Sequence, residues 1–263
     1  MLFSEALGFT LIYNSAIFGW STDHVVLHLN TDECTIPASQ VEAIVDDAVK
    51  IWSSVSTSRL TLSRGESFSG TGASAIQAGG DTSGYPSPAI LCASDFSHQL
   101  GDDGNYIPAF SDARLVHNQI AYSYVIINAE AGKKANIANV QVKLPGKMPV
   151  VLAHEIGHAL GLGHSADTGA LMYYDLTDRK KITLTEDDAD GITYLYPRQE
   201  PSGGKSFGCT PASANVTSAE ISAKSGHPSP ADIQGWQRFF EVFFGLPTLL
   251  IGAYFLTRSR LVK

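Results

Sequence analysis

An eleven-residue run, HEIGHALGLGH at positions 154–164, constrains this chain more than any other feature of its sequence. Residues four apart on an α-helix lie on the same face, one turn above the other, so His154 and His158 can turn their imidazoles toward one metal ion. Glu155 follows His154 around the helix and can reach a metal-bound water without being a ligand itself. The first half of the run is therefore predicted to be helical.

A third ligand has to come from beyond this helix, because a catalytic zinc site takes three protein ligands and leaves one position open. Gly161 tolerates the left-handed backbone that ends a helix, and Gly163 adds further freedom for His164 to swing back to the same ion. We therefore predict a zinc site ligated by His154, His158 and His164. Three neutral imidazoles leave the ion its full charge, which lowers the pKa of bound water from about 15.7 to ~7.

The predicted reaction is hydrolysis of a peptide bond by the zinc-bound water, with Glu155 as the catalytic base. Glu155 takes the proton of the water as it attacks a polarised carbonyl, and then passes that proton to the departing amine. A short His-Glu-x-x-His match arises by chance, whereas two glycines and a third histidine make this run far more specific. The alternative is a helix whose histidines only line a polar groove. Five other histidines lack this spacing and are interpreted as surface or core residues: His24, His28, His98, His117 and His227.

The run and its surroundings resemble the metzincin metallopeptidases, and within them the matrixin-like branch related to the matrix metalloproteinases. The resemblance rests on the run itself, on Ser165 directly after it, and on ALMY at 170–173, which is similar to the family's Met-turn. It covers about residues 20–197. It implies a twisted, mostly parallel sheet with three helices and an active-site cleft, in which Met172 forms an apolar floor beneath the zinc ligands.

The chain also departs from the matrixin pattern. Tyr174 stands where matrixins usually carry proline, two residues past the methionine, where the astacin and serralysin branches place a tyrosine that can approach the zinc. It is interpreted either as a transition-state donor or as a tyrosine of the pocket wall. Asp102, Asp103 and Asn105 are interpreted as a surface turn, with a Ca²⁺ site as the alternative interpretation. Substrate preference is expected to depend on a pocket beside residues 173–178.

The order of apolar patterns around the run favours an α+β domain. Strands are expected at 24–29, 60–62, 90–91 and 120–128. The first helix is predicted to be capped by Ser39, with Glu42 completing a capping box. Seven apolar residues would then form its buried face: Val41, Ile44, Val45, Ala48, Ile51, Trp52 and Val55.

Two further helices are expected. Pro149 is predicted to open the helix of the histidine run, because proline suits the first helical turn. The last helix is predicted to begin near Thr185, with Asp188 completing a capping box. Ala189, Ile192 and Leu195 would form its inner face.

Net charge and cysteines narrow the class of protein. The formal charge of −8 argues against nucleic acid as a partner, because a phosphate-binding surface needs a basic stripe. The three cysteines lie outside any Cys-x-x-Cys pair, which argues against a cysteine zinc site. In an exported protein Cys34 and Cys92 could form a bridge and leave Cys209 unpaired, whereas three unrelated thiols are the alternative.

The N-terminal end has an apolar stretch at 6–20 that is similar to the core of a secretion signal, although Glu5 stands where a basic residue is expected. Residues 1–19 are therefore interpreted either as a signal-like segment or as a segment packed on the domain. The catalytic domain is expected at 20–197. Residues 198–237, rich in Ser, Pro and Gly, are predicted to be a flexible linker.

The C-terminal end, 238–263, is predicted to be a hydrophobic membrane anchor or a sorting tail that is later cleaved. A helix starting at residue 239 and ending at 256 would rise roughly 27 Å, and the basic residues that follow can snorkel across the remainder of a hydrocarbon core of about 30 Å. The basic end places the bulk of the chain outside the cytoplasm. The alternative is an amphipathic or buried helix.

Together these patterns predict an exported, membrane-anchored zinc endopeptidase that acts on protein or peptide substrates. The competing hypothesis is a binding or adhesion module that keeps the fold without catalysis. It would predict a damaged ligand or a damaged Glu155, and all four residues of the site are intact.

Overall fold

The computed structural model describes residues 8–14, 17–70, 72, 73, 76, 86–100 and 104–198. The predicted C-terminal tail, and the predicted linker apart from its first residue, lie outside the described residues, as do Asp102 and Asp103 of the calcium hypothesis. Within the described part of the chain, no helix is both long and apolar enough to cross a bilayer.

One five-stranded sheet forms the centre of the domain, in the order β2-β1-β3-β5-β4. The strands are β1 His24–Asn30, β2 Thr61–Arg64, β3 Ala89–Ala93, β4 Ala109–Val116 and β5 Gln119–Asn128. Neighbouring strands are parallel from β2 through β5, and only β4 runs antiparallel to its neighbour. The mostly parallel sheet expected from the resemblance is therefore confirmed.

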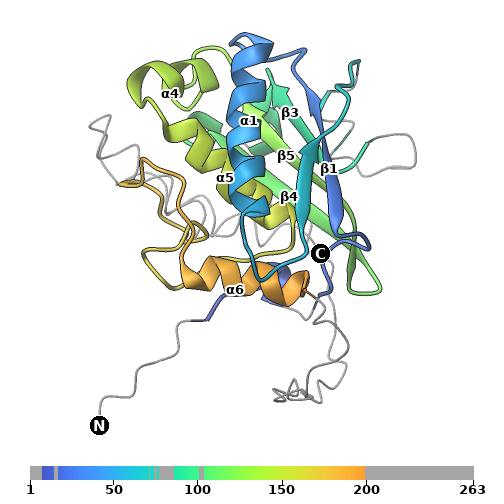
Figure 1. Ribbon diagram of the computed structural model, residues 1–263. Helices are drawn as coiled ribbons and strands as arrows, with labels where there is room; N and C mark the ends of the chain where they lie inside the picture. Colours follow the sequence, from blue (N-terminus) through green and yellow to red (C-terminus); the bar gives the residue numbers. More distant parts are fainter. Residues whose placement is uncertain are drawn as a thin grey trace, which may run out of the picture.

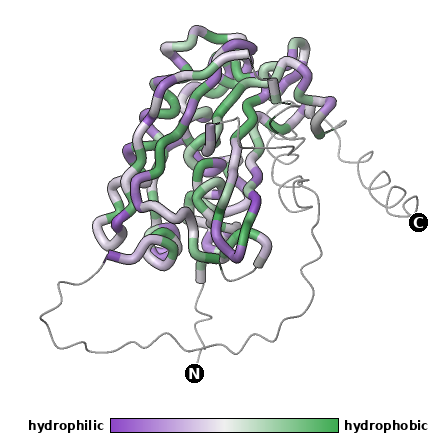
Figure 2. The backbone as a smooth tube through the Cα atoms, turned by 90° about the vertical axis from the view of Figure 1, so that its right-hand side faces the viewer, coloured by the Kyte–Doolittle hydropathy of each residue, from purple (hydrophilic) through white to green (hydrophobic). Residues whose placement is uncertain are grey.

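The described part of the domain also contains five α-helices (Figure 1). They are α1 Ala38–Ser53, α3 Phe96–Leu100, α4 Ile137–Lys143, α5 Lys147–Ala159 and α6 Glu186–Leu195. Helices α1 and α5 lie side by side, α1 contacting β2 and α5 contacting β4 and β5, while α6 crosses the lower end of the molecule in Figure 1. The hydropathy colouring of Figure 2 shows the hydrophobic stretches running through the strands and the helices packed on them.

Helix α1 has the predicted apolar face but not the predicted cap. Five of the seven expected residues are buried within the helix, Val55 is buried just after it, and Ile51 is partly buried. The cap at Ser39 is wrong: the N-cap is Pro37, and no side chain caps the helix. The helix begins at Ala38, so Ser39 already lies in its first turn, where its hydroxyl no longer precedes the unpaired backbone N–H groups.

Of the other two long helices, α6 has the predicted capping box, whereas α5 begins two residues before the predicted start. Helix α5 begins at Lys147, so Pro149 lies in its first turn as expected but does not open it. The capping box of α6 is confirmed, since the Thr185 side chain accepts from the backbone of Asp188 and the Asp188 side chain accepts from the backbone of Thr185.

Strand β4 and the short helices α3 and α4 were not expected from the sequence. Strand β4 is an edge strand whose burial does not alternate regularly, so it lacks the period-two signal of a half-buried strand. Helix α4 spans only seven residues, fewer than the roughly 11 needed to recognise a helical periodicity, although Asn136 caps it by accepting from the backbone N–H of Ala138.

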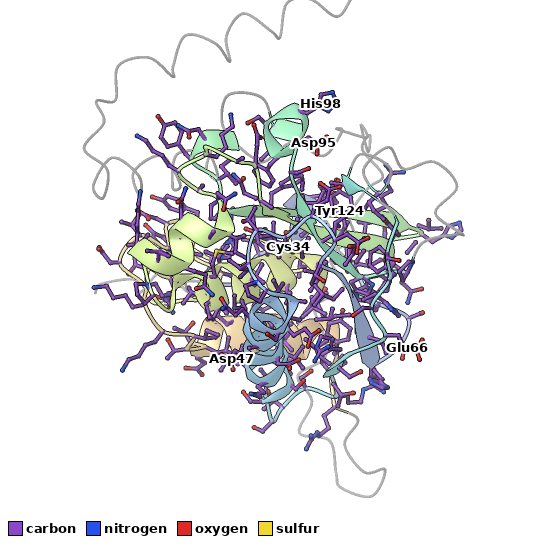
Figure 3. All side chains as sticks on the ribbon, turned by 90° about the horizontal axis from the view of Figure 1, so that it is seen from above. Cys34, Asp47, Glu66, Asp95, His98 and Tyr124 are labelled. Carbon is purple, nitrogen blue, oxygen red and sulfur yellow. A yellow bond between two sulfur atoms is a disulfide. The ribbon has the colours of Figure 1, made fainter. Side chains whose placement is uncertain are left out.

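A disulfide joins Cys34, labelled in Figure 3, to Cys92. Their Cα atoms are 5.1 Å apart and 58 residues separate them in the sequence. The bridge links the loop after β1 to the buried strand β3, and closing so long a loop restricts the unfolded chain. The pairing considered for an exported protein is therefore present.

Candidate metal centre

The three histidines of the run meet at one point. His154 and His158 lie one turn apart on α5, and His164 follows the end of that helix. One ring nitrogen from each histidine lies within 4.8 Å of those of the other two. No other group of three or more His, Cys, Asp or Glu in the described part of the chain meets the same criterion.

Backbone carbonyls fix the orientation of two of the rings. Nδ1 of His154 lies 2.8 Å from the carbonyl oxygen of Leu171, and Nδ1 of His158 lies 2.7 Å from that of Leu162. Because a carbonyl oxygen can only accept, Nδ1 carries the proton in both rings. Nε2 would then be the atom that ligates a metal, and the two Nε2 atoms lie 3.1 Å apart, close to the separation of two nitrogens at ~2.0–2.1 Å from one zinc ion.

The loop after α5 brings in the third histidine for two local reasons. Gly161 has φ of 113°, a conformation that favours glycine, and it turns the chain out of the helix as predicted. Gly163 acts differently from the prediction: a Cβ there would lie 2.4 Å from Oγ1 of Thr10 and 2.7 Å from the carbonyl oxygen of Leu11. Because Gly163 has no side chain, the N-terminal segment around Thr10 and Leu11 can pack directly against the loop.

The residues after the run form a floor under α5, as the Met-turn resemblance implies. Met172 is buried, and a Cβ on Gly157 of α5 would lie only 2.4 Å from its Sδ atom, so the methionine and the helix are in close contact. Leu171, whose carbonyl orients His154, precedes it directly.

Asp188 holds this floor in place, a role that the sequence did not indicate. Its carboxylate is 1% exposed and accepts from the backbone N–H groups of Leu171 at 2.7 Å and Met172 at 2.9 Å. It also accepts from the backbone N–H of Thr185 at 2.9 Å. One buried carboxylate therefore links the cap of α6 to the backbone that orients His154.

Glu155 lies beside the cluster and is 5% exposed. Its Oε2 atom accepts a hydrogen bond of 2.6 Å from the hydroxyl of Ser111, which lies in the edge strand β4. The predicted base is thus held between the active-site helix and the edge of the sheet. Ser111 is a site residue that the sequence analysis missed, because β4 itself was not recognised.

The N-terminal segment 8–14 lies along the loop of the third histidine. Ile12 donates its backbone N–H to the carbonyl of Gly161 at 3.0 Å, and Gly163 donates to the carbonyl of Thr10 at 2.8 Å. Farther along the segment, the hydroxyl of Tyr13 lies 2.6 Å from the carbonyl oxygen of Ala113 on β4. The segment therefore connects the loop to the edge strand that carries Ser111.

Tyr174 and Asn105 are two further candidate residues from the sequence. Tyr174 is half-buried and packs against Tyr173 with ring centroids 4.5 Å apart, so its role in catalysis stays a prediction. Asn105, the one described residue of the calcium hypothesis, accepts instead from the backbone N–H of Lys134 and Ala135. These bonds tie Asn105 to a segment about 30 residues away, and both the calcium site and the surface turn stay predictions.

Comparison with known proteins agrees with this geometry. Residues 121–197 match the peptidase family described as Matrixin. The chain is 27% identical to stromelysin-1 of Rattus norvegicus over 195 residues, which cover 69% of the chain and 34% of that relative. It is 28% identical to neutrophil collagenase of Homo sapiens over 180 residues, covering 67% of the chain and 33% of the relative. A shorter match, 55% identical over 47 residues, relates it to metalloendoproteinase 1 of Glycine max, covering 18% of the chain and 15% of the relative.

The chain thus spans about a third of the length of the stromelysin and the collagenase that it matches. The matched family region contains the histidine run, the methionine floor and α6, which are the elements that build the centre. On the family match and these relatives, residues 121–197 are similar to the matrixin metallopeptidases.

Proposed function

We propose that the chain is a zinc-dependent endopeptidase in which His154, His158 and His164 hold the metal and Glu155 is the catalytic base. The observation that carries the proposal is the convergence of three imidazole nitrogens beside a buried carboxylate that is not one of the ligands. Nitrogen donors of this kind fit Zn²⁺, and three of them leave a position for substrate.

Zinc, when bound, supplies a Lewis acid that polarises a peptide carbonyl and lowers the pKa of water. The residues of the chain do the rest. The carbonyls of Leu171 and Leu162 keep the Nδ1 protons of His154 and His158 in place, so both Nε2 atoms face the metal position. The Glu155 carboxylate accepts a proton from the attacking water and returns it to the leaving amine.

The competing hypothesis of a silent binding module makes the opposite prediction for catalysis. The test uses the full chain loaded with zinc, a broad peptide library and mass spectrometry of the product termini. Glu155→Gln removes the base, and Glu186→Gln, at an exposed glutamate of α6, is the matched control. Cleavage within peptides that requires both the metal and Glu155 would support the endopeptidase hypothesis. Absence of any cleavage by the zinc-loaded wild type would favour the binding-module hypothesis.

We further propose that the protein is exported and held at a membrane by its C-terminal segment. Matrixin relatives and the Cys34–Cys92 bridge both favour an oxidising compartment outside the cytoplasm. The anchor rests on the apolar composition of residues 239–256 alone. Membrane partitioning of the full chain, compared with a chain ending at residue 235, tests it, and equal partitioning of the two would refute it.

A further inference from the structure

Lys147 is a buried lysine that the proposed chemistry does not use. It is the first residue of α5 and is 3% exposed. Its Nζ atom donates to the carbonyl oxygens of three residues that lie close together beyond the Met-turn: Leu176, Thr177 at 3.2 Å and Arg179 at 2.9 Å.

This position is costly for a cation in two ways. The N-terminus of a helix carries a partial positive charge, so a lysine there is repelled, and burial removes the ammonium group from water. Burial lowers the pKa of Lys147 from its ordinary value of 10.5 to about 8, while the nearby Asp175 and Asp178 favour the charged form. Three carbonyl acceptors match the three N–H donors of an ammonium group, which compensates for the lost hydration.

The carbonyls belong to the specificity segment, which we define as residues 173–183. The backbone from 173 to 183 has no helix or strand of its own, so its polar groups need partners from elsewhere. It starts directly beside the metal centre, because Ser165 donates its backbone N–H to the carbonyl of Met172 at 2.8 Å and pairs with Tyr173. Its first residue, Tyr173, therefore lies next to the loop that carries His164.

A second cation ties the same segment to the Met-turn. The guanidinium group of Arg179 donates to the carbonyl oxygens of Gly169 and Ala170, the latter at 2.8 Å, and to that of Thr183 at 3.2 Å. Arg179 thus joins the segment to the residues before Met172, and Lys147 joins it to the start of the active-site helix.

We propose that Lys147 is a positioning residue that fixes the specificity segment against α5 and thereby sets which substrate side chain is accepted beside the cleaved bond. The first half of this proposal depends only on the three carbonyl contacts. The second half rests on the proposed peptidase function.

Hydrogen–deuterium exchange of the full, zinc-loaded chain tests the first half. Lys147→Met keeps the length of the side chain but removes its donors, and Lys181→Met removes the same charge from an exposed position of the same segment. Losing hydrogen bonds to a charged group should speed exchange in peptides covering 173–183 by on the order of tenfold, with Lys147→Arg in between. Exchange in Lys147→Met equal to that of Lys181→Met would overturn the proposal.

A measurement on the wild-type chain covers the case in which Lys147→Met does not fold. With ¹⁵N-labelled lysine at pH 6, an ammonium group bound to three carbonyls should show protons that exchange slowly with water and give a resolved signal, absent from Lys147→Arg. A wild-type spectrum without any protected ammonium signal would contradict the contacts on which the proposal rests.

Peptide cleavage tests the second half. The test uses a panel of peptides that differ only in the side chain after the cleaved bond. For the wild type and for Lys147→Met, kcat/KM of the best peptide is divided by that of the poorest. This ratio should be about tenfold smaller for Lys147→Met, and the change should come from KM more than from kcat. Zinc content should equal that of the wild type. An unchanged ratio would refute the role in specificity. If the wild type cleaves no peptide, the proposed function fails, while the exchange and ammonium measurements still decide on the positioning role.

Discussion

The metal centre and the specificity segment lie next to each other but are held in different ways. The centre depends on spacing within one helix and on backbone carbonyls that follow closely in the sequence, such as that of Leu162 for His158. The specificity segment depends on long side chains that reach across the fold, such as Lys147, about 30 residues away from its carbonyl partners. The placement of the three histidines therefore depends mainly on local sequence, whereas the placement of the specificity segment depends on tertiary contacts.

The largest effect on activity is expected at Glu155, the proposed catalytic base. Glu155→Gln keeps the shape of the side chain but removes the proton acceptor, so kcat/KM should fall by about 10²–10⁴-fold. Zinc content and thermal stability should stay close to those of Glu186→Gln. A Glu155→Gln chain that retains more than a tenth of wild-type activity would show that another group takes the proton.

The next largest effect is expected at Asp188, where the centre joins α6. Asp188→Asn replaces one acceptor oxygen of a buried carboxylate by an NH₂ group facing backbone N–H donors, so the free energy of unfolding should drop by about 2–4 kcal/mol. Asp190→Asn, an exposed position on the same helix, is the control and should change stability by less than about 0.5 kcal/mol. Denaturant unfolding measures both, and equal effects would remove Asp188 from its proposed role in the floor.

The specificity segment should respond to pH through Lys147. Burial lowers the pKa of Lys147 in the folded chain to about 8, against 10.5 in the unfolded chain, with Asp175 and Asp178 opposing the shift and Arg179 and Lys180 adding to it. Between these values the unfolded chain binds more protons, so the free energy of unfolding should rise with pH, by about 1 kcal/mol per unit.

Subtracting the pH profile of Lys147→Met from that of the wild type isolates this contribution from other lysines and tyrosines. The same titration leaves a neutral amine with two donors for three carbonyls, so exchange in the specificity segment, corrected for intrinsic rates, should become faster above pH 8. A difference profile that is flat from pH 7 to 10 would contradict a lowered pKa at Lys147.

The smallest effect is expected at Ser111, which orients Glu155 from the edge strand. Ser111→Ala should lower kcat by about threefold to tenfold with little change in KM, because one hydrogen bond to a charged group is lost. Ser111→Thr keeps the hydroxyl and should restore most of the rate. Equal rates for the alanine and threonine variants would indicate that the hydroxyl has no part in positioning the base.

The sequence predicted the convergence of the three histidines because that part of the centre depends on local spacing. The two histidines need only helical spacing, Gly161 needs only a helix end, and Met172 follows at a fixed distance. Asp188 shows where this reasoning stops: its capping box is a local pattern and was predicted, whereas its bonds to the Met-turn backbone join residues 16 and 17 positions away.

The same limit applies to the sheet and to the specificity segment. Parallel strands with continuous apolar runs, such as β5, were recognised, but the edge strand β4 lacks a regular alternation, so Ser111 was missed with it. Lys147 could not be assigned a role from sequence because its partners are backbone carbonyls, which any residue provides. Such contacts leave no pattern of residue types to detect.

The central claim is that the three-histidine cluster holds a catalytic zinc, and a zinc titration of the metal-stripped full chain tests it most directly. Cleavage of a reporter peptide and bound metal are measured in the same samples, with His158→Ala as the ligand variant. We expect cleavage to rise in proportion to bound zinc, to level off at about one ion per chain, and to be absent from His158→Ala. Cleavage that persists without metal, or a zinc-saturated wild type that cleaves nothing, would contradict the account.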